Sequence, residues 1–184
     1  MTNKKMLLAT VLLSTLGFSA ASQADAPVPV TADFSSAFVQ WSGFAKVIPG
    51  NDIVITGARS GAVEDGVLTV NGDGTFKTKT PITLESRLYW DQGTGTKTAG
   101  DLFATNWTMD TDGATASWGA NSTAGMDIKM IDTASGTELT TTTGVEAAST
   151  VILSVNSDVP VTAGGALNLL EPLIVQANVL ATVG

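Results

Sequence analysis

The residues best suited to chemistry in this chain are carboxylates gathered at glycine-containing breaks. Asp110-Thr111-Asp112-Gly113 and Asn71-Gly72-Asp73-Gly74 look like pieces of calcium-binding loops, in which alternate residues supply oxygen ligands. Neither has the glutamate that such a loop places at its twelfth position, so we interpret both as turns. Glu64 and Asp65 also stand beside a glycine, where acidic residues are ordinary solvated surface. The sequence therefore predicts no metal site.

The composition removes most ways of building a catalytic centre. The 184 residues include no histidine and no cysteine, so the commonest general base, the commonest metal ligand and every thiolate are missing. Serines are numerous, but a serine nucleophile needs a base. We therefore predict no catalytic residue, no cofactor and no enzyme activity.

The four tryptophans are the other candidates for a ligand site. Trp41, Trp90, Trp107 and Trp118 could stack on a sugar, because aromatic rings bury a large apolar face and keep a polar edge. Trp41 and Trp90 lie within strand-like segments, and for these two we favour core packing. A carbohydrate-binding surface stays open as an alternative.

Composition and charge bound the class of protein that must position these residues. At 43% hydrophobic and 14% charged residues, the chain is too apolar to be disordered, and its length suits one folded domain. The formal charge is −8, which repels phosphate backbones. Nucleic acid is therefore excluded as an expected partner.

The first residues resemble an export signal. Lys4 and Lys5 precede an apolar run over 6–18, and Ser22-Gln23-Ala24 has the small-x-small pattern of a signal-peptidase site. The run is shorter than the roughly 20 residues that cross a bilayer. We expect residues 1–24 to be a signal peptide, cleaved before Asp25, and the protein to be exported through the periplasm to the cell surface.

The remainder is a succession of short strands separated by turn residues, the pattern of an all-β sandwich. A hairpin is expected where residues 67–70 and 75–78 flank Asn71-Gly72-Asp73-Gly74, because Asn and Gly accept the positive φ of tight turns. Residues 140–143 and 93–100 read as loops, and 166–170 is the one short helix candidate. The strands expected are Ile53 to Thr56, Val67 to Val70, Ile82 to Trp90, Leu102 to Met109, Met126 to Ile131, Val151 to Val155 and Leu173 to Val183.

Two terminal segments alternate between apolar and other residues with a period of two, which places each apolar row on one face of a strand. The first row contains Val28, Val30, Ala32 and Phe34. Pro27 and Pro29 lie between its members and lack an N–H, so this segment suits a sheet edge or a detachable arm. The second row contains Leu173, Val175, Ala177, Val179, Ala181 and Val183. Because no partner strand follows it, we expect this strand to be a protected edge or one wall of a groove that another chain fills. The alternative is an ordinary last strand of a complete sandwich.

Several short segments resemble the subunits of fimbriae assembled by the chaperone-usher route, above all the cysteine-free major subunits of common pili. They are the signal peptide, Val30-Thr31-Ala32, Trp41-Ser42, Ala45-Lys46, Leu84-Glu85-Ser86-Arg87-Leu88 and Met130-Ile131-Asp132-Thr133-Ala134-Ser135-Gly136.

This resemblance implies an incomplete immunoglobulin-like sandwich, residues 37–184, completed by donor-strand exchange. Residues 25–36 would be the donor arm, which inserts Val28, Val30, Ala32 and Phe34 into the groove of a neighbouring subunit. The partners implied are identical or related pilin subunits, a periplasmic chaperone, an outer-membrane usher and a host or surface receptor. The function implied is a structural one in a bacterial fimbria that supports adhesion and biofilm formation. The rival hypothesis is a monomeric secreted carbohydrate-binding sandwich.

Overall fold

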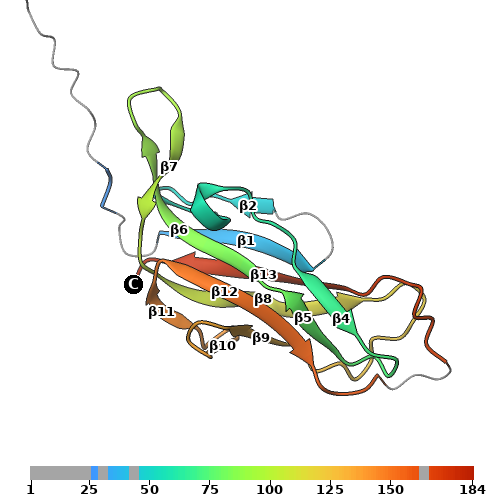
Figure 1. Ribbon diagram of the computed structural model, residues 1–184. Helices are drawn as coiled ribbons and strands as arrows, with labels where there is room; N and C mark the ends of the chain where they lie inside the picture. The colour runs from blue at the N-terminus through green and yellow to red at the C-terminus, as the bar shows by residue number, and fades with distance from the viewer. Residues whose placement is uncertain (1–25, 29–32, 42–45, 162–165) are drawn as a thin grey trace, which may run out of the picture.

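The computed structural model of the chain describes residues 26–28, 33–41, 46–161 and 166–184, without the side chains of 36–41 and 46 (Figure 1). The expected signal peptide therefore lies outside the described residues, and so do Val30 and Ala32 of the expected donor arm.

The described strands form two antiparallel sheets. The first sheet has the order β11 (Val145–Ala148), β8 (Thr105–Ser117), β13 (Ile174–Thr182), β1 (Phe34–Trp41) and β2 (Lys46–Ile48). The second has the order β10 (Glu138–Leu139), β9 (Lys129–Asp132), β12 (Thr150–Ser157), β5 (Phe76–Thr80) and β4 (Val67–Val70). In the second sheet β12 also pairs with β6 (Ile82–Asp91), whose other partners are β3 (Ile53–Thr56) and β7 (Lys97–Leu102). A short 3₁₀ helix, η1 (Ala58–Ser60), follows β3.

The two sheets enclose one hydrophobic core, so the fold is an all-β sandwich. Val175 and Val179 of the first sheet are fully buried, as are Leu84 and Leu153 of the second. Along β12 and β13 buried and half-buried residues alternate strictly, as expected for strands with one face in a core. The expectation of an all-β sandwich is confirmed.

The turn chemistry of the sequence identified the β4–β5 hairpin correctly. Val70 pairs with Phe76, and the N–H of Asn71 donates to the carbonyl oxygen of Thr75 at 2.8 Å. Gly74 has a φ of +87°, a conformation that an L side chain rarely adopts. The expected strands at 53–56 and 67–70 agree with β3 and β4 residue for residue.

At Asp110-Thr111-Asp112-Gly113 the residues typical of turns predicted a turn, but the structure has a bulge inside β8. Ala177 of β13 pairs with Ala114 and Val179 pairs with Met109, so four residues of β8 lie opposite Asn178 alone. The Asn178 side chain donates to the Asp110 carboxylate at 3.0 Å. The prediction that the strand ends at Met109 is therefore wrong, because a polar bulge lets the strand continue.

Two other local expectations are wrong. Residues 166–170 do not form a helix, and residues 97–100 of the expected loop belong to β7, which pairs with the end of β6.

The tryptophans also differ from expectation: Trp90 is only half-buried, and its ring lies against Gly100 of β7. The fully buried tryptophans are Trp107 and Trp118, whose indole N–H groups donate to the backbone oxygens of Ala148 and Glu171. The side chain of Trp41 is outside the description.

Candidate assembly site

The last strand, β13, has a partner strand on each side. It pairs with β8 along one edge and with β1 along the other, where Phe34 faces Thr182 and Trp41 faces Val175 (Figure 1). The expectation that β13 lies at a sheet edge is wrong here, and β13 agrees instead with the alternative of an ordinary last strand in a complete sandwich. The strand that closes the sheet is the N-terminal one, and we call the contact between β1 and β13 the terminal seam.

The apolar row predicted on the last strand lies in the core. Leu173, Val175, Ala177, Val179 and Ala181 are buried, whereas Val183 is half-buried. Because these side chains fill the space between the sheets, displacing the strand beside them would open that part of the core to water. The pairing of β1 with β13 therefore stabilises the fold by keeping water out of this part of the core.

The start of β1 is anchored by polar side chains that the sequence did not single out. The Asp33 carboxylate accepts the N–H groups of Asn51 and Asp52 at 3.0 and 2.9 Å. The fully buried Ser35 hydroxyl donates to the Ile48 carbonyl oxygen and accepts the Ile55 N–H, both at 3.1 Å. These residues therefore tie β1 to β2 and β3.

The phase of the first apolar row is inverted in this subunit. Asp33 and Ser35 are buried, while 57% of Phe34 and 87% of Val28 are exposed. Asp33 and Ser35 are polar yet lie in the core, because each finds hydrogen-bond partners inside the fold. Residues 33–36, which we expected to belong to a detachable arm, here belong to the sandwich.

We expect Ser35→Ala to lower the free energy of unfolding by about 1–3 kcal/mol, because it leaves the Ile55 N–H without its acceptor inside the core. Urea unfolding followed by circular dichroism measures the loss. Ser122→Ala, at an exposed position, is the matched control, and equal midpoints for the two variants would contradict the anchoring role.

The connection from β1 to β2 decides how β1 can move. The strand β2 has three residues, and each lies opposite a residue of β1: Lys46 opposite Phe38, Val47 opposite Ala37 and Ile48 opposite Ser36. It runs back from the middle of β1 toward the end of the seam where Phe34 and Thr182 lie. With three residues and one partner strand, β2 is a short strand at the edge of the first sheet.

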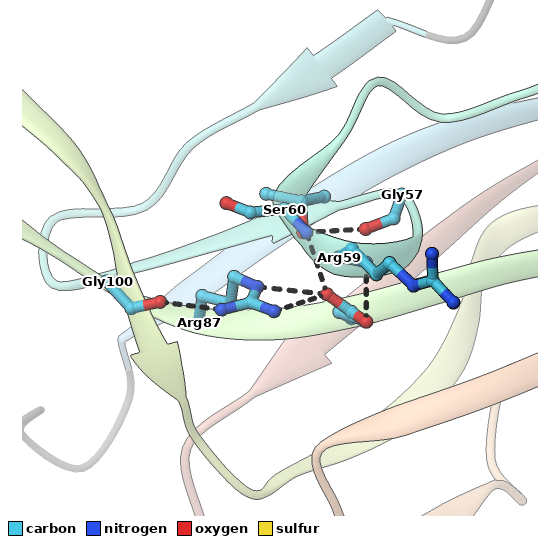
Figure 2. Close-up of polar contacts among 7 residues, drawn as sticks. Gly57, Arg59, Ser60, Arg87 and Gly100 are labelled. Carbon is cyan, nitrogen blue, oxygen red and sulfur yellow. Dashed lines mark hydrogen bonds and ion pairs between the residues drawn. The ribbon is translucent and has the colours of Figure 1, made fainter.

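A second polar cluster lies between β6 and η1 (Figure 2). The Glu85 carboxylate accepts the N–H groups of Arg59 and Ser60 at 2.8 and 3.1 Å, and Arg87 donates to it from Nε and Nη2 at 2.9 and 2.7 Å. Arg59 and Ser60 have φ values of 56° and 62°, a strained conformation for two consecutive non-glycine residues. The carboxylate therefore holds this turn in place.

Burial opposes ionisation of Glu85, but the N–H groups of Arg59 and Ser60 and the Arg87 guanidinium outweigh it and lower the pKa of the carboxyl from its ordinary value. The i, i+2 spacing of Glu85 and Arg87 on one strand was the available sequence signal, since alternate residues share a face. An ion pair that supports a turn is a structural device, and we assign no catalysis to it.

A cavity of about 520 Å³ lies where β13 begins, at the opposite end of the seam from Thr182. Its walls include Val67, Val70, Trp118, Leu169 and Leu173. Within residues 26–28, 33–41, 46–161 and 166–184 no group of three or more acidic residues is gathered as metal ligands would be. Nor does that part of the chain contain a helix with the length and hydropathy of a membrane span.

Comparison with known proteins gives no assignment: no protein-family model, no curated protein and no solved structure matches this chain.

Proposed function

We propose that this protein is a structural subunit of a bacterial surface fimbria, and that it polymerises by exchanging β1 between subunits. The observation that carries the proposal is the terminal seam, where β13 pairs with β1, the first strand among the described residues. Its eight residue pairs could form equally well with a β1 from another copy, and exchange of identical elements is a low-cost route to assembly. The sandwich would then be an immunoglobulin-like fold completed by a donor strand.

The donor strand proposed here is β1, which differs from the donor arm that the resemblance implied. Because β1 occupies the place beside β13, Val28, Val30 and Ala32 cannot insert there, and the exchanged element is Phe34–Trp41 itself. Residues 25–33 lie beyond it. The proposal includes a periplasmic chaperone and an outer-membrane usher, since a subunit with an unfilled seam needs a partner until it polymerises. The role that it gives the filament is to support surface adhesion and biofilm formation.

The direction of β2 determines whether exchange closes or propagates. If β2 stays in its own subunit, residues 42–45 must connect it to a β1 that leaves the neighbour beside Val175. Four residues reach only about 13–14 Å, so the Val175 ends of both subunits must meet, and the exchange closes as a two-fold dimer.

If β2 is released, residues 42–48 become a longer connector. The chain then re-enters its own subunit at Gly50–Asp52, beside Asp33, which lies at the Thr182 end of the seam. The Thr182 end of the donor then meets the Val175 end of the acceptor. This arrangement is head-to-tail and extends without limit, so we propose that release of β2 accompanies filament growth.

An engineered disulfide across the seam tests the exchange directly. Phe34 and Thr182 lie opposite each other, and directly opposed residues have Cα atoms about 4.5–5.5 Å apart, within disulfide range. The chain has no cysteine of its own. We expect Phe34→Cys combined with Thr182→Cys to give a covalent ladder of multimers when filaments are run on a non-reducing gel.

The matched control is Phe34→Cys combined with Leu180→Cys, because Leu180 faces Ser36 and is out of register with Phe34. It should give no ladder. If filaments of the Phe34→Cys, Thr182→Cys variant dissolve entirely into internally cross-linked monomers, β1 stays in its own subunit. This result would contradict the proposed function.

A second disulfide tests the release of β2. Ser36 and Ile48 are opposed across β1 and β2, so Ser36→Cys combined with Ile48→Cys links the two strands. We expect the oxidised protein to stop at monomers and dimers in electron micrographs, and filaments to return after reduction. Filaments of normal length under oxidising conditions, with the disulfide formed, would contradict the release of β2.

The rival hypothesis, a monomeric carbohydrate-binding sandwich, has less support. Trp107 and Trp118 are buried with their indole N–H groups bonded to the backbone, so neither offers a free ring face to a sugar. Trp90, half-buried against Gly100, is the remaining described candidate. A well-behaved monomer without filaments, which binds a glycan and loses binding in Trp90→Ala, would favour this rival.

A further inference from the structure

We propose that the cavity beside β4 is a docking site for the N-terminal segment, residues 25–32, of a second copy of this chain. We call this cavity, lined by Asp65, Gly66, Val67, Leu68, Val70, Trp118, Leu169, Glu171, Pro172 and Leu173, the β4 pocket. The proposal extends the assembly proposed above, since it rests on contacts between copies, but it concerns a different surface from the terminal seam.

The β4 pocket has the character of a peptide-binding groove. Its volume, about 520 Å³, lies in the range of pockets that hold ligands. Val67, Val70 and Leu169 are exposed to 46%, 37% and 56%, although large aliphatic side chains gain free energy from burial. These side chains therefore offer apolar surface that a partner can cover.

The strand beside the pocket has a free side for a new strand. In the part of the chain that the structure describes, β4 pairs with β5 only and forms the end of its sheet. An edge strand presents N–H and C=O groups to which an extended peptide can add. The occupant should therefore be extended, apolar on one face and able to pair along one side.

Residues 25–32 meet each of these requirements. Val28, Val30 and Ala32 alternate with Pro27, Pro29 and Thr31. In a strand, the backbone groups of residues 27 and 29 point to one side and those of residues 28 and 30 to the other. The N–H groups that the prolines lack are therefore missing from one side only, and the other side can still form hydrogen bonds. Such a segment can pair as a new edge strand, and Val28 is 87% exposed in its own subunit.

The segment is too short to reach the β4 pocket of its own subunit. It is held at Asp33, whose carbonyl oxygen accepts the Val183 N–H at the end of β13, whereas Leu173 of the pocket precedes that strand. Ten residue steps along β13 cover about 33 Å, and eight residues fully extended cover at most about 26–29 Å. Figure 1 shows β4 at the opposite end of the sandwich from the C-terminus. The occupant therefore comes from another molecule.

In the head-to-tail arrangement, residues 25–32 of one copy lie next to the β4 pocket of another. A β1 that completes the next subunit directs residues 25–32 beyond the Thr182 end of that subunit. In a growing filament this end adjoins the following subunit where its β13 begins, which is where the β4 pocket lies. The segment thus links each subunit to the second one along the filament.

Binding of a synthetic peptide of residues 25–32 tests the proposal without requiring filaments. The receptor is the protein locked by the disulfide between positions 34 and 182, purified as a monomer. Trp118 lines the pocket and its indole N–H donates to the Glu171 oxygen, so its ¹⁵N–¹H signal, assigned with Trp118→Phe, reports occupancy. We expect this signal to shift and saturate as peptide is added, while the Trp90 signal stays in place.

Neighbouring leucines supply a matched pair of variants. Leu169 lines the pocket, whereas Leu170 does not and is 94% exposed. Leu169→Asp should weaken peptide binding at least tenfold and Leu170→Asp should leave it unchanged; a peptide with Val28→Asp and Val30→Asp should not bind. Binding that survives Leu169→Asp, or no shift at millimolar peptide, would overturn the proposal. Peptide binding without a gel ladder would instead reject β1 exchange and leave the docking site, so the two failures are distinguishable.

Discussion

Val179→Asp is expected to remove most of the stability of the folded protein. Val179 is fully buried in the middle of β13, and a carboxylate there would have no partner inside the core. An unpaired buried charge is among the few changes that cost more than about 4 kcal/mol, against a total stability of about 5–15 kcal/mol for a domain. Thermal unfolding followed by circular dichroism should show a large fall in Tm or no folded protein.

The control for this substitution is the next residue along the strand. Leu180 lies on the opposite face of β13 and is half-buried, so Leu180→Asp should lose far less. Asn178→Asp is unsuitable as a control because the Asn178 amide donates to Asp110, and a carboxylate at position 178 would repel that of Asp110. Equal losses in Val179→Asp and Leu180→Asp would contradict the assignment of the two faces.

Glu85→Ala is the second substitution with a large expected effect. It leaves the Arg87 guanidinium, only 15% exposed, without its partner, and it leaves the N–H groups of Arg59 and Ser60 without an acceptor. Removing one member of a buried ion pair costs about 3–5 kcal/mol. Urea unfolding at neutral pH should show this loss, whereas Glu64→Ala, at an exposed position, should unfold with the parent.

The pH dependence of the unfolding free energy is a separate measure of how much the Glu85 carboxylate stabilises the fold. The pKa of Glu85 is lower in the folded protein than its ordinary value of 4.5, because its hydrogen bonds outweigh the effect of burial. Its contribution to stability is therefore fully present above pH 4.5 and is lost as the pH falls through the folded pKa. We expect the difference in unfolding free energy between the parent and Glu85→Gln to shrink as the pH falls below 4.5. A difference that stays constant would show that the charge of Glu85 does not stabilise the fold.

Local chemistry accounts for the parts of the fold that the sequence predicted well. The alternation of residues 173–183 identified the buried face of β13, and the Asn and Gly residues at 71–74 identified the β4–β5 turn. Each of these features depends on residues close in the chain, where the period of a strand or the φ of a turn residue is decisive. The same reasoning failed at 110–113, because the turn residues there form a bulge stabilised by Asn178, 68 residues away.

The sequence by itself determined that the protein is all-β, that the row from Leu173 to Ala181 faces a core, and that a histidine- or cysteine-based centre is absent. Only the tertiary structure decided which strand lies beside β13, why Ser35 rather than Phe34 is buried, and where Glu85 finds its partners. Strand neighbours depend on pairings between distant segments, and a one-residue change of phase exchanges the two faces of a strand. A polar residue such as Ser35 can enter a core when distant backbone groups bond to it, and no period in the sequence records those groups.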